Sequence, residues 1–141
     1  MSDSIAGSPR LAVAAAAVLA IEGAALTFFA VIELFGLGAG QAVVLPTAIA
    51  LIVLTLIGAV ALFAFAFGTR RGHTWARSGG VVLQVLAVAL ALASFGVQPV
   101  PWMFILGVGL PGLAGLVLLI AASRREGRAE TETEPEVEAE S

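Results

Sequence analysis

The sequence predicts an all-α fold in which four transmembrane helices form a bundle of two antiparallel hairpins. Sixty per cent of the 141 residues are hydrophobic and only 12% are charged, whereas soluble domains carry about 25% charged residues. The hydrophobic residues fall into four long stretches separated by short links that contain glycine or proline. A soluble domain of this size buries only about 60–70% of its chain surface. We therefore expect lipid to surround these stretches.

Each stretch is long enough to cross a bilayer, because about 20 helical residues span the hydrocarbon layer. Helical structure is required there, since backbone groups in lipid have no water to bond. The first stretch is longer than the hydrophobic region of a cleaved signal peptide, so we expect it to remain as a membrane anchor. The expected segments are an N-terminal tail (1–9), four spans (10–35, 43–67, 75–97 and 101–122), a basic link (68–74) and an acidic tail (123–141).

The positive charges give the bundle a direction. All seven basic residues are arginines, and they lie before the first span, around the second link or after the fourth span. Because basic residues favour the cytoplasmic side, we expect both termini in the cytoplasm (N-in/C-in) of a bacterial cell, with the bundle in the plasma membrane. The arginines expected to contact lipid headgroups are Arg70, Arg71, Arg77, Arg124 and Arg125.

The C-terminal segment differs from the rest of the chain. Seven of the ten acidic residues lie between Glu126 and Glu140. A segment of this composition cannot bury enough apolar surface to offset the entropy of ordering it, so we expect it to be disordered. No part of the sequence is basic enough to bind nucleic acid, so we expect no nucleic-acid partner.

Reactive groups are scarce. The chain has no cysteine and a single histidine, His73, which excludes disulfides, thiolate metal sites and thiol catalysis. No pattern of nucleophile, base or metal ligands is visible. We expect no enzymatic activity and no cofactor.

Glu22 is the most informative polar residue. It lies near the middle of the first span, where an ionised side chain costs at least about 2.5–3.5 kcal/mol, so the neutral form is favoured. Thr55 and Gln84 lie at similar depths in the next two spans, and the three residues are expected to form one polar layer. Glu33 follows Glu22 by about three helical turns, so we expect it on the same face, nearer the outer surface.

Two interpretations of Glu22 remain open. In the first, it is a protonated carboxyl group that donates a hydrogen bond to another helix and holds helices together with about 0.6 kcal/mol or somewhat more. In the second, it binds a proton or cation during transport, because intramembrane acids are functional candidates by default. In the fourth span, Gly107, Pro111 and Gly115 are expected to form a small-residue groove for a neighbouring helix or a second copy.

Two short motifs carry a resemblance. IEGAAL at residues 21–26 and RRGHTWAR at residues 70–77 resemble those of a group of small, largely uncharacterised four-helix integral membrane proteins of actinobacteria. The resemblance implies the same fold and a bacterial plasma membrane, and it implies no activity.

The length, the four spans and Glu22 also resemble the small multidrug-resistance transporters, in which such a glutamate exchanges protons for cationic drugs. The chain departs from them because it has no tyrosine, and because all its arginines fall on one side of the expected membrane.

From the residues we expect a non-catalytic accessory or assembly subunit that contacts the lipid bilayer and either a larger membrane protein or a second copy of itself. The alternative is a small proton-coupled transporter of an amphipathic solute that uses Glu22.

Overall fold

The protein is helical throughout residues 7–40 and 44–140, apart from short links, in the computed structural model, which describes these residues. The helices are α1 (Gly7–Gly38), α2 (Leu45–Arg70), α3 (Thr74–Ala93), the short 3-10 turn η1 (Ser94–Gly96) and α4 (Trp102–Glu140). Each of the four α-helices contains a segment that is long and apolar enough to cross a membrane. The fold is therefore compatible with a multi-pass membrane protein.

The helix ends differ from the predicted span ends. Helix α2 continues to Arg70, past the predicted end at residue 67, and α3 ends at Ala93, before the predicted end at residue 97. Helix α1 continues through Gly36 to Gly38, and α4 continues beyond the predicted end of the fourth span to Glu140. The predicted disorder of residues 123–141 is therefore not confirmed. The arginines, glutamates and alanines of this segment are good helix formers, which favours a helical extension of α4. The predicted start of the second span at residue 43 and most of the N-terminal tail lie outside the described residues.

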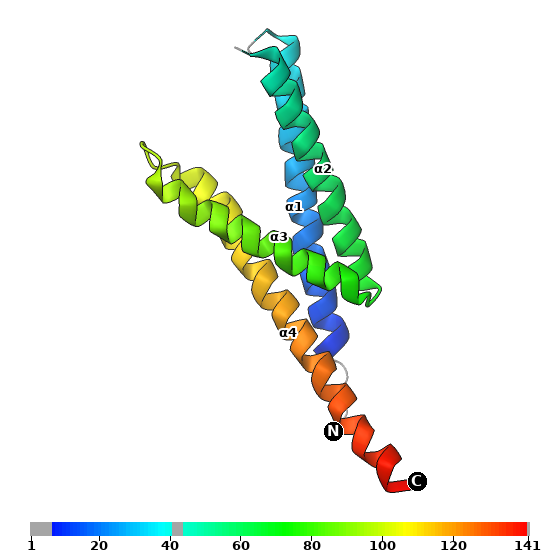
Figure 1. The fold of residues 1–141 in the computed structure, drawn as a ribbon. Coiled ribbons are helices and arrows are strands. Elements are labelled where there is room, and N and C mark those ends of the chain that lie inside the picture. Colours follow the sequence, from blue (N-terminus) through cyan, green and yellow to red (C-terminus); the bar gives the residue numbers. More distant parts are fainter. Residues whose placement is uncertain (1–6, 41–43, 141) are drawn as a thin grey trace.

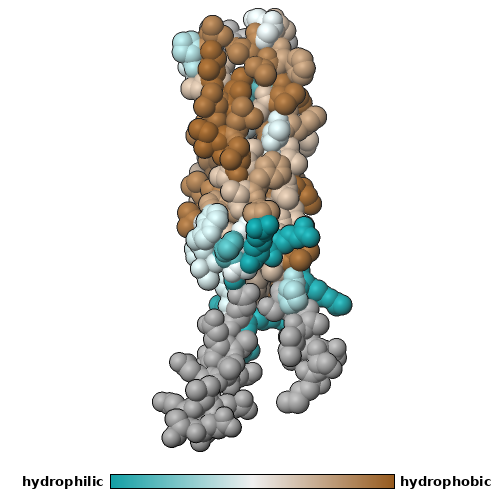
Figure 2. All heavy atoms as spheres, turned by 90° about the vertical axis from the view of Figure 1, so that its right-hand side faces the viewer, coloured by the Kyte–Doolittle hydropathy of each residue, from teal (hydrophilic) through white to brown (hydrophobic). Residues whose placement is uncertain are grey.

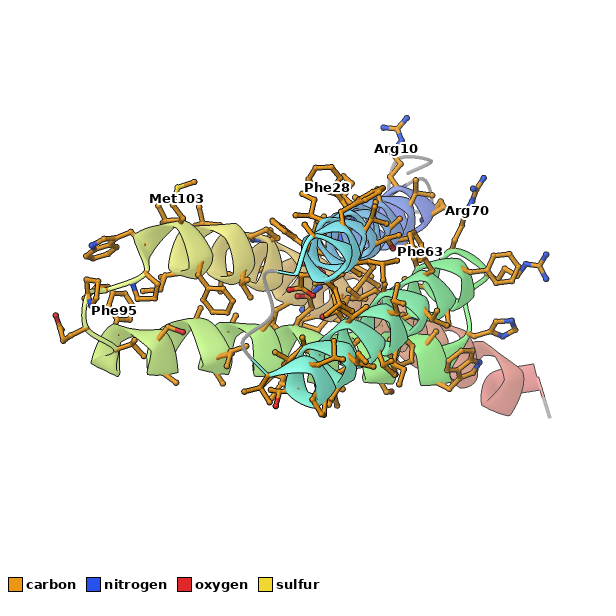
Figure 3. All side chains as sticks on the ribbon, turned by 90° about the horizontal axis from the view of Figure 1, so that it is seen from above. Arg10, Phe28, Phe63, Arg70, Phe95 and Met103 are labelled. Carbon is orange, nitrogen blue, oxygen red and sulfur yellow. The ribbon has the colours of Figure 1, made fainter. Side chains whose placement is uncertain are left out.

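The four helices pack in a ring, so that α1 contacts α2 and α4 while α3 contacts α2 and α4. Seen from above, α1 and α4 lie in one layer and α2 and α3 in the other (Figure 3). Arg10 and Arg70 lie at one end of the molecule, and Phe95 and Met103 lie at the other (Figure 3). We call these the arginine end and the Phe95 end.

The two hairpins meet in a core near the arginine end. The core contains Ala15 and Leu19 of α1, Leu62 and Ala66 of α2, and Leu119 of α4, and Leu19 and Leu119 are both 0% exposed. Helix α3 joins this core at Gly80, where a Cβ atom would lie 3.1 Å from Leu119 and 3.5 Å from Leu19. The glycine therefore allows three helices to approach one another.

Toward the Phe95 end the hairpin of α1 and α2 diverges from the hairpin of α3 and α4 (Figure 1). The two helices of the α3–α4 hairpin remain in contact there. A Cβ on Gly109 of α4 would lie 3.0 Å from that of Ala91 in α3, which shows close packing of these two helices. The divergence therefore separates the hairpins without opening either one.

The outer surface of the bundle is apolar. Only 17–28% of the most apolar segment of each span is buried inside the protein, so most of these side chains face outward. Figure 2 shows apolar residues over the upper part of the molecule and a hydrophilic band near the arginine end. A soluble protein would bury this surface, whereas a protein in a bilayer presents it to lipid.

Candidate functional site

Glu22 and Gln84 form a hydrogen bond across the bundle. The side-chain amide of Gln84 in α3 donates to Oε2 of Glu22 in α1, with a distance of 2.6 Å between nitrogen and oxygen. The two residues come from different hairpins, and Figure 1 shows α3 crossing α1 near its middle. We call these two residues the Glu22–Gln84 pair. The pair lies one helical turn beyond Leu19 along α1, where the core ends and the hairpins begin to diverge.

Two glycines of α4 make room for the side chain of Gln84. Gln84 is 1% exposed. A Cβ on Gly115 would lie 2.6 Å from the amide nitrogen of Gln84, and one on Gly112 would lie 3.4 Å from its amide oxygen. Any larger residue at position 115 would occupy space that Gln84 uses. The two glycines thus leave the space in which the amide of Gln84 reaches Glu22.

The buried residues of α3 and α4 follow a coiled-coil repeat. In α4 they include Ile105, Gly112, Gly115, Leu119 and Ala122, and in α3 they include Arg77, Gly80, Gln84 and Ala91. Spacings that alternate between three and four residues, with an occasional seven, place these side chains along one seam between two helices. Polar residues in such a seam help to specify how the helices align, at some expense in stability. The buried polar side chains of the seam in α3 are Arg77, in the first turn, and Gln84, near the middle of the helix.

Glu22 is less enclosed than its partner. It is partly buried, while Ile21 beside it is exposed. The predicted continuation of the polar face at Glu33 is exposed. The two carboxyl groups share a face of α1, as the spacing predicts, but the hairpins have diverged at the depth of Glu33. Glu33 is therefore exposed, although it lies on the same face of α1 as Glu22.

Thr55 does not join the pair in the way that the sequence predicts. Its hydroxyl donates to the carbonyl of Leu51 in its own helix, at 2.9 Å. A threonine in a helix satisfies its hydroxyl in this way without a partner from another helix. Of the three residues predicted to form one polar layer, Glu22 and Gln84 therefore bond to each other, and Thr55 bonds to its own helix.

Four other hydroxyl groups along the spans bond locally as well. Thr27, Ser78, Ser94 and Ser123 each donate to the carbonyl four residues earlier, at distances of 2.8–3.1 Å. Such bonds satisfy each hydroxyl inside its own helix. None of these four bonds connects Glu22 to either end of the bundle.

The arginines predicted to contact headgroups fall into two groups. Arg70, Arg71, Arg124 and Arg125 are exposed near the ends of α2 and of the fourth span. Arg77 departs from the prediction, because it is only 7% exposed and its Nη2 donates to the carbonyl of Gly72 at 2.8 Å. It lies in the seam, one turn before Gly80, and holds the link between α2 and α3 instead of reaching outward.

The pair can act in two chemical ways. A carboxyl and an amide can hold helices together, or the carboxyl can take up and release a proton. Within the described residues no three His, Cys, Asp or Glu side chains gather into a group that could hold a metal ion. No family model, curated protein or solved structure matches this chain.

Sequence reasoning identified Gly115 but missed Gly109 and Gly112. The predicted groove of Gly107, Pro111 and Gly115 assumes a four-residue spacing, but a Cβ on Gly107 would have no neighbour within 4 Å. The contacts to α3 come from Gly109, Gly112 and Gly115. The signal that identifies them is the three-and-four-residue repeat of the seam, which connects Gly112 and Gly115 with Leu119 and Ala122.

We predict that Gly115→Ala destabilises the protein by about 1–3 kcal/mol, as overpacking of a filled interior does. The new methyl group forces Gln84 to move and breaks its bond to Glu22. Gly107→Ala is the matched control in the same helix, and it should leave stability unchanged or raise it by up to about 1 kcal/mol. Thermal unfolding in detergent measures both. Equal stability of the two variants would contradict the packing of Gln84 against Gly115.

Proposed function

We propose that this chain is a non-catalytic integral protein of a bacterial plasma membrane that acts as an accessory or assembly subunit. The observation that carries the proposal is the Glu22–Gln84 pair within a seam of small residues. Glu22, the carboxyl group near the middle of the first span, accepts a hydrogen bond from Gln84, and two glycines of α4 make room for the Gln84 side chain. A polar group used in this way aligns helices, and the rest of the surface remains available to lipid and to a protein partner.

The local bonding of the hydroxyl groups supports this proposal. A proton pathway through a membrane protein needs a succession of polar groups that exchange partners. Here Thr27, Thr55 and Ser94 each bond to the backbone of their own helix. The hydrogen atom of each of these hydroxyl groups is therefore used in a local bond to the backbone.

The second candidate function is proton-coupled transport of a small amphipathic solute. It is favoured by the partial exposure of Glu22, which lies where the hairpins diverge. A carboxyl group in that position can exchange a proton and meet a solute that enters between the hairpins. Intramembrane carboxyl groups in transporters serve in this way.

The proposed orientation places both termini and the link between α2 and α3 in the cytoplasm. It rests on the seven arginines, which all lie on one side of the four spans in sequence. The same orientation places the link between α3 and α4 on the outer side of the membrane. Both links carry exposed residues, His73 in the first and Gln98 in the second.

We predict that a membrane-impermeant maleimide labels Gln98→Cys in intact cells and labels His73→Cys only after the membrane is made permeable. The chain has no cysteine of its own, so each variant contains a single thiol and needs no further change. Labelling of His73→Cys, but not of Gln98→Cys, in intact cells would reverse the proposed orientation.

We predict that Glu22→Gln distinguishes the two functions, because it keeps an oxygen acceptor for Gln84 but cannot take up a proton. An accessory subunit should bind its protein partner or second copy as the wild type does. A transporter should lose proton-coupled uptake in proteoliposomes, while Glu33→Gln, which changes the exposed carboxyl of the same helix, should keep it. A wild-type chain that purifies alone in mild detergent would contradict the accessory role. Uptake that is equal in Glu22→Gln and wild type would contradict the transporter.

A further inference from the structure

A basic hollow lies at the arginine end of α2. It is an open hollow with a volume of about 390 Å³, lined by Phe67, Arg70 and Arg71. Figure 3 shows Arg70 pointing away from the bundle at this end. We propose that the hollow binds the phosphate group of an anionic phospholipid. The proposal requires that the bundle spans a membrane, and it does not depend on the accessory role.

The backbone around the hollow is fixed by a helix cap. Gly72 adopts a φ of +79°, which is the left-handed conformation that favours glycine. Its N–H donates to the carbonyl of Thr69 at 3.1 Å, and the N–H of His73 donates to the carbonyl of Gly68 at 2.9 Å. These two bonds form a Schellman motif. The two arginines therefore come from a helix end whose conformation is set before any ligand binds.

Arg77 adds a second constraint. Its guanidinium group bonds to the carbonyl of Gly72 and is buried beside the link. This bond ties the cap of α2 to the first turn of α3. A ligand at the hollow thus meets a link that is already closed, so less ordering entropy opposes binding.

The two lining arginines are suited to a phosphate. The guanidinium carbon of Arg71 lies 4.2 Å from the centre of the Phe67 ring, a cation–π contact that holds the planar group in one orientation. Guanidinium groups bind phosphate oxygens through two parallel hydrogen bonds. Arg70, the preceding residue, also lines the hollow, which therefore carries two positive charges. Each contributes about 1 kcal/mol of attraction to an anionic membrane surface.

The negative end of the α2 dipole does not outweigh these charges. A helix C-terminus carries about half a negative charge on its free carbonyl groups, against two full positive charges from the arginines. The carbonyls of Phe67, Gly68 and Thr69 also accept bonds from the N–H groups of Arg71, His73 and Gly72. The net potential at the hollow is therefore positive.

The surface leading to the hollow favours a lipid over a free phosphate ion. Val60, Phe63 and Phe67 are exposed and lie three or four residues apart on α2, so they form one apolar stripe that ends at the arginines. A phospholipid places its chains along such a stripe and its phosphate beyond the end of the stripe. A free phosphate ion gains nothing from the stripe.

The test measures the binding of phosphatidylglycerol to the detergent-purified chain by native mass spectrometry. The hollow variant is Arg70→Gln with Arg71→Gln, and the matched control is Arg124→Gln with Arg125→Gln, which removes the same charge after the fourth span. We expect the hollow variant to bind phosphatidylglycerol at least tenfold more weakly than wild type. The control should stay within about threefold of wild type, since its arginines are not part of the hollow. Thermal unfolding in detergent checks that each variant is folded.

Three further measurements distinguish a phospholipid from other ligands. Arg70→Lys with Arg71→Lys keeps the charge without the planar group, so its affinity for phosphatidylglycerol should lie between those of the wild type and the glutamine variant. This lysine variant also tests the proposal if the glutamine variant does not fold. Phosphatidylcholine should bind more weakly than phosphatidylglycerol, and inorganic phosphate should not compete. Equal losses in the hollow and control variants, or unchanged binding in both hollow variants, would overturn the proposal. Competition by inorganic phosphate at equal concentration would replace the lipid with a free anion.

Discussion

The Glu22–Gln84 hydrogen bond is the interaction on which the arrangement of the two hairpins depends. In lipid the apolar side chains give little preference for one packing over another, because lipid tails are as apolar as the side chains. Helices in a membrane are therefore aligned by close packing and by polar contacts. Here one polar contact joins α1 to α3, and the glycines of α4 determine where Gln84 can lie.

Small residues make the contact between Glu22 and Gln84 possible, and their positions determine how far along the bundle the two hairpins stay in contact. Gly80, Gly112 and Gly115 let α3 approach its neighbours closely enough for the core and the pair to form. Beyond the pair the hairpins diverge (Figure 1), and the small residues there pack within a hairpin, as Ala91 and Gly109 do. The bundle is thus joined near the arginine end and separated near the Phe95 end. This asymmetry leaves Glu22 at the boundary between the two regions.

The sequence predicts the number and approximate extent of the helices because hydrophobicity and length decide which segments cross a bilayer. It also brings Glu22 and Gln84 to one depth, since depth follows from position along each span. It does not predict the separation of the hairpins, and for that reason the interior positions expected for Glu33 and Thr55 do not match the structure. The exposure of those residues depends on the angle at which α3 crosses α1, which no single helix encodes. Arg77 departs from the headgroup contact expected from its charge for another reason. Its guanidinium group bonds to the carbonyl of Gly72 at the end of α2, and it is buried there.

A double-mutant cycle tests the central claim most directly. It compares the unfolding free energies in detergent of the wild type, Glu22→Leu, Gln84→Leu and the double variant. We expect a coupling energy of at least about 0.6 kcal/mol, the average for hydrogen bonds between membrane helices, with about 1.7 kcal/mol as the upper value. Additive effects of the two substitutions, with no coupling beyond experimental error, would show that the two side chains act independently and that another contact aligns the hairpins.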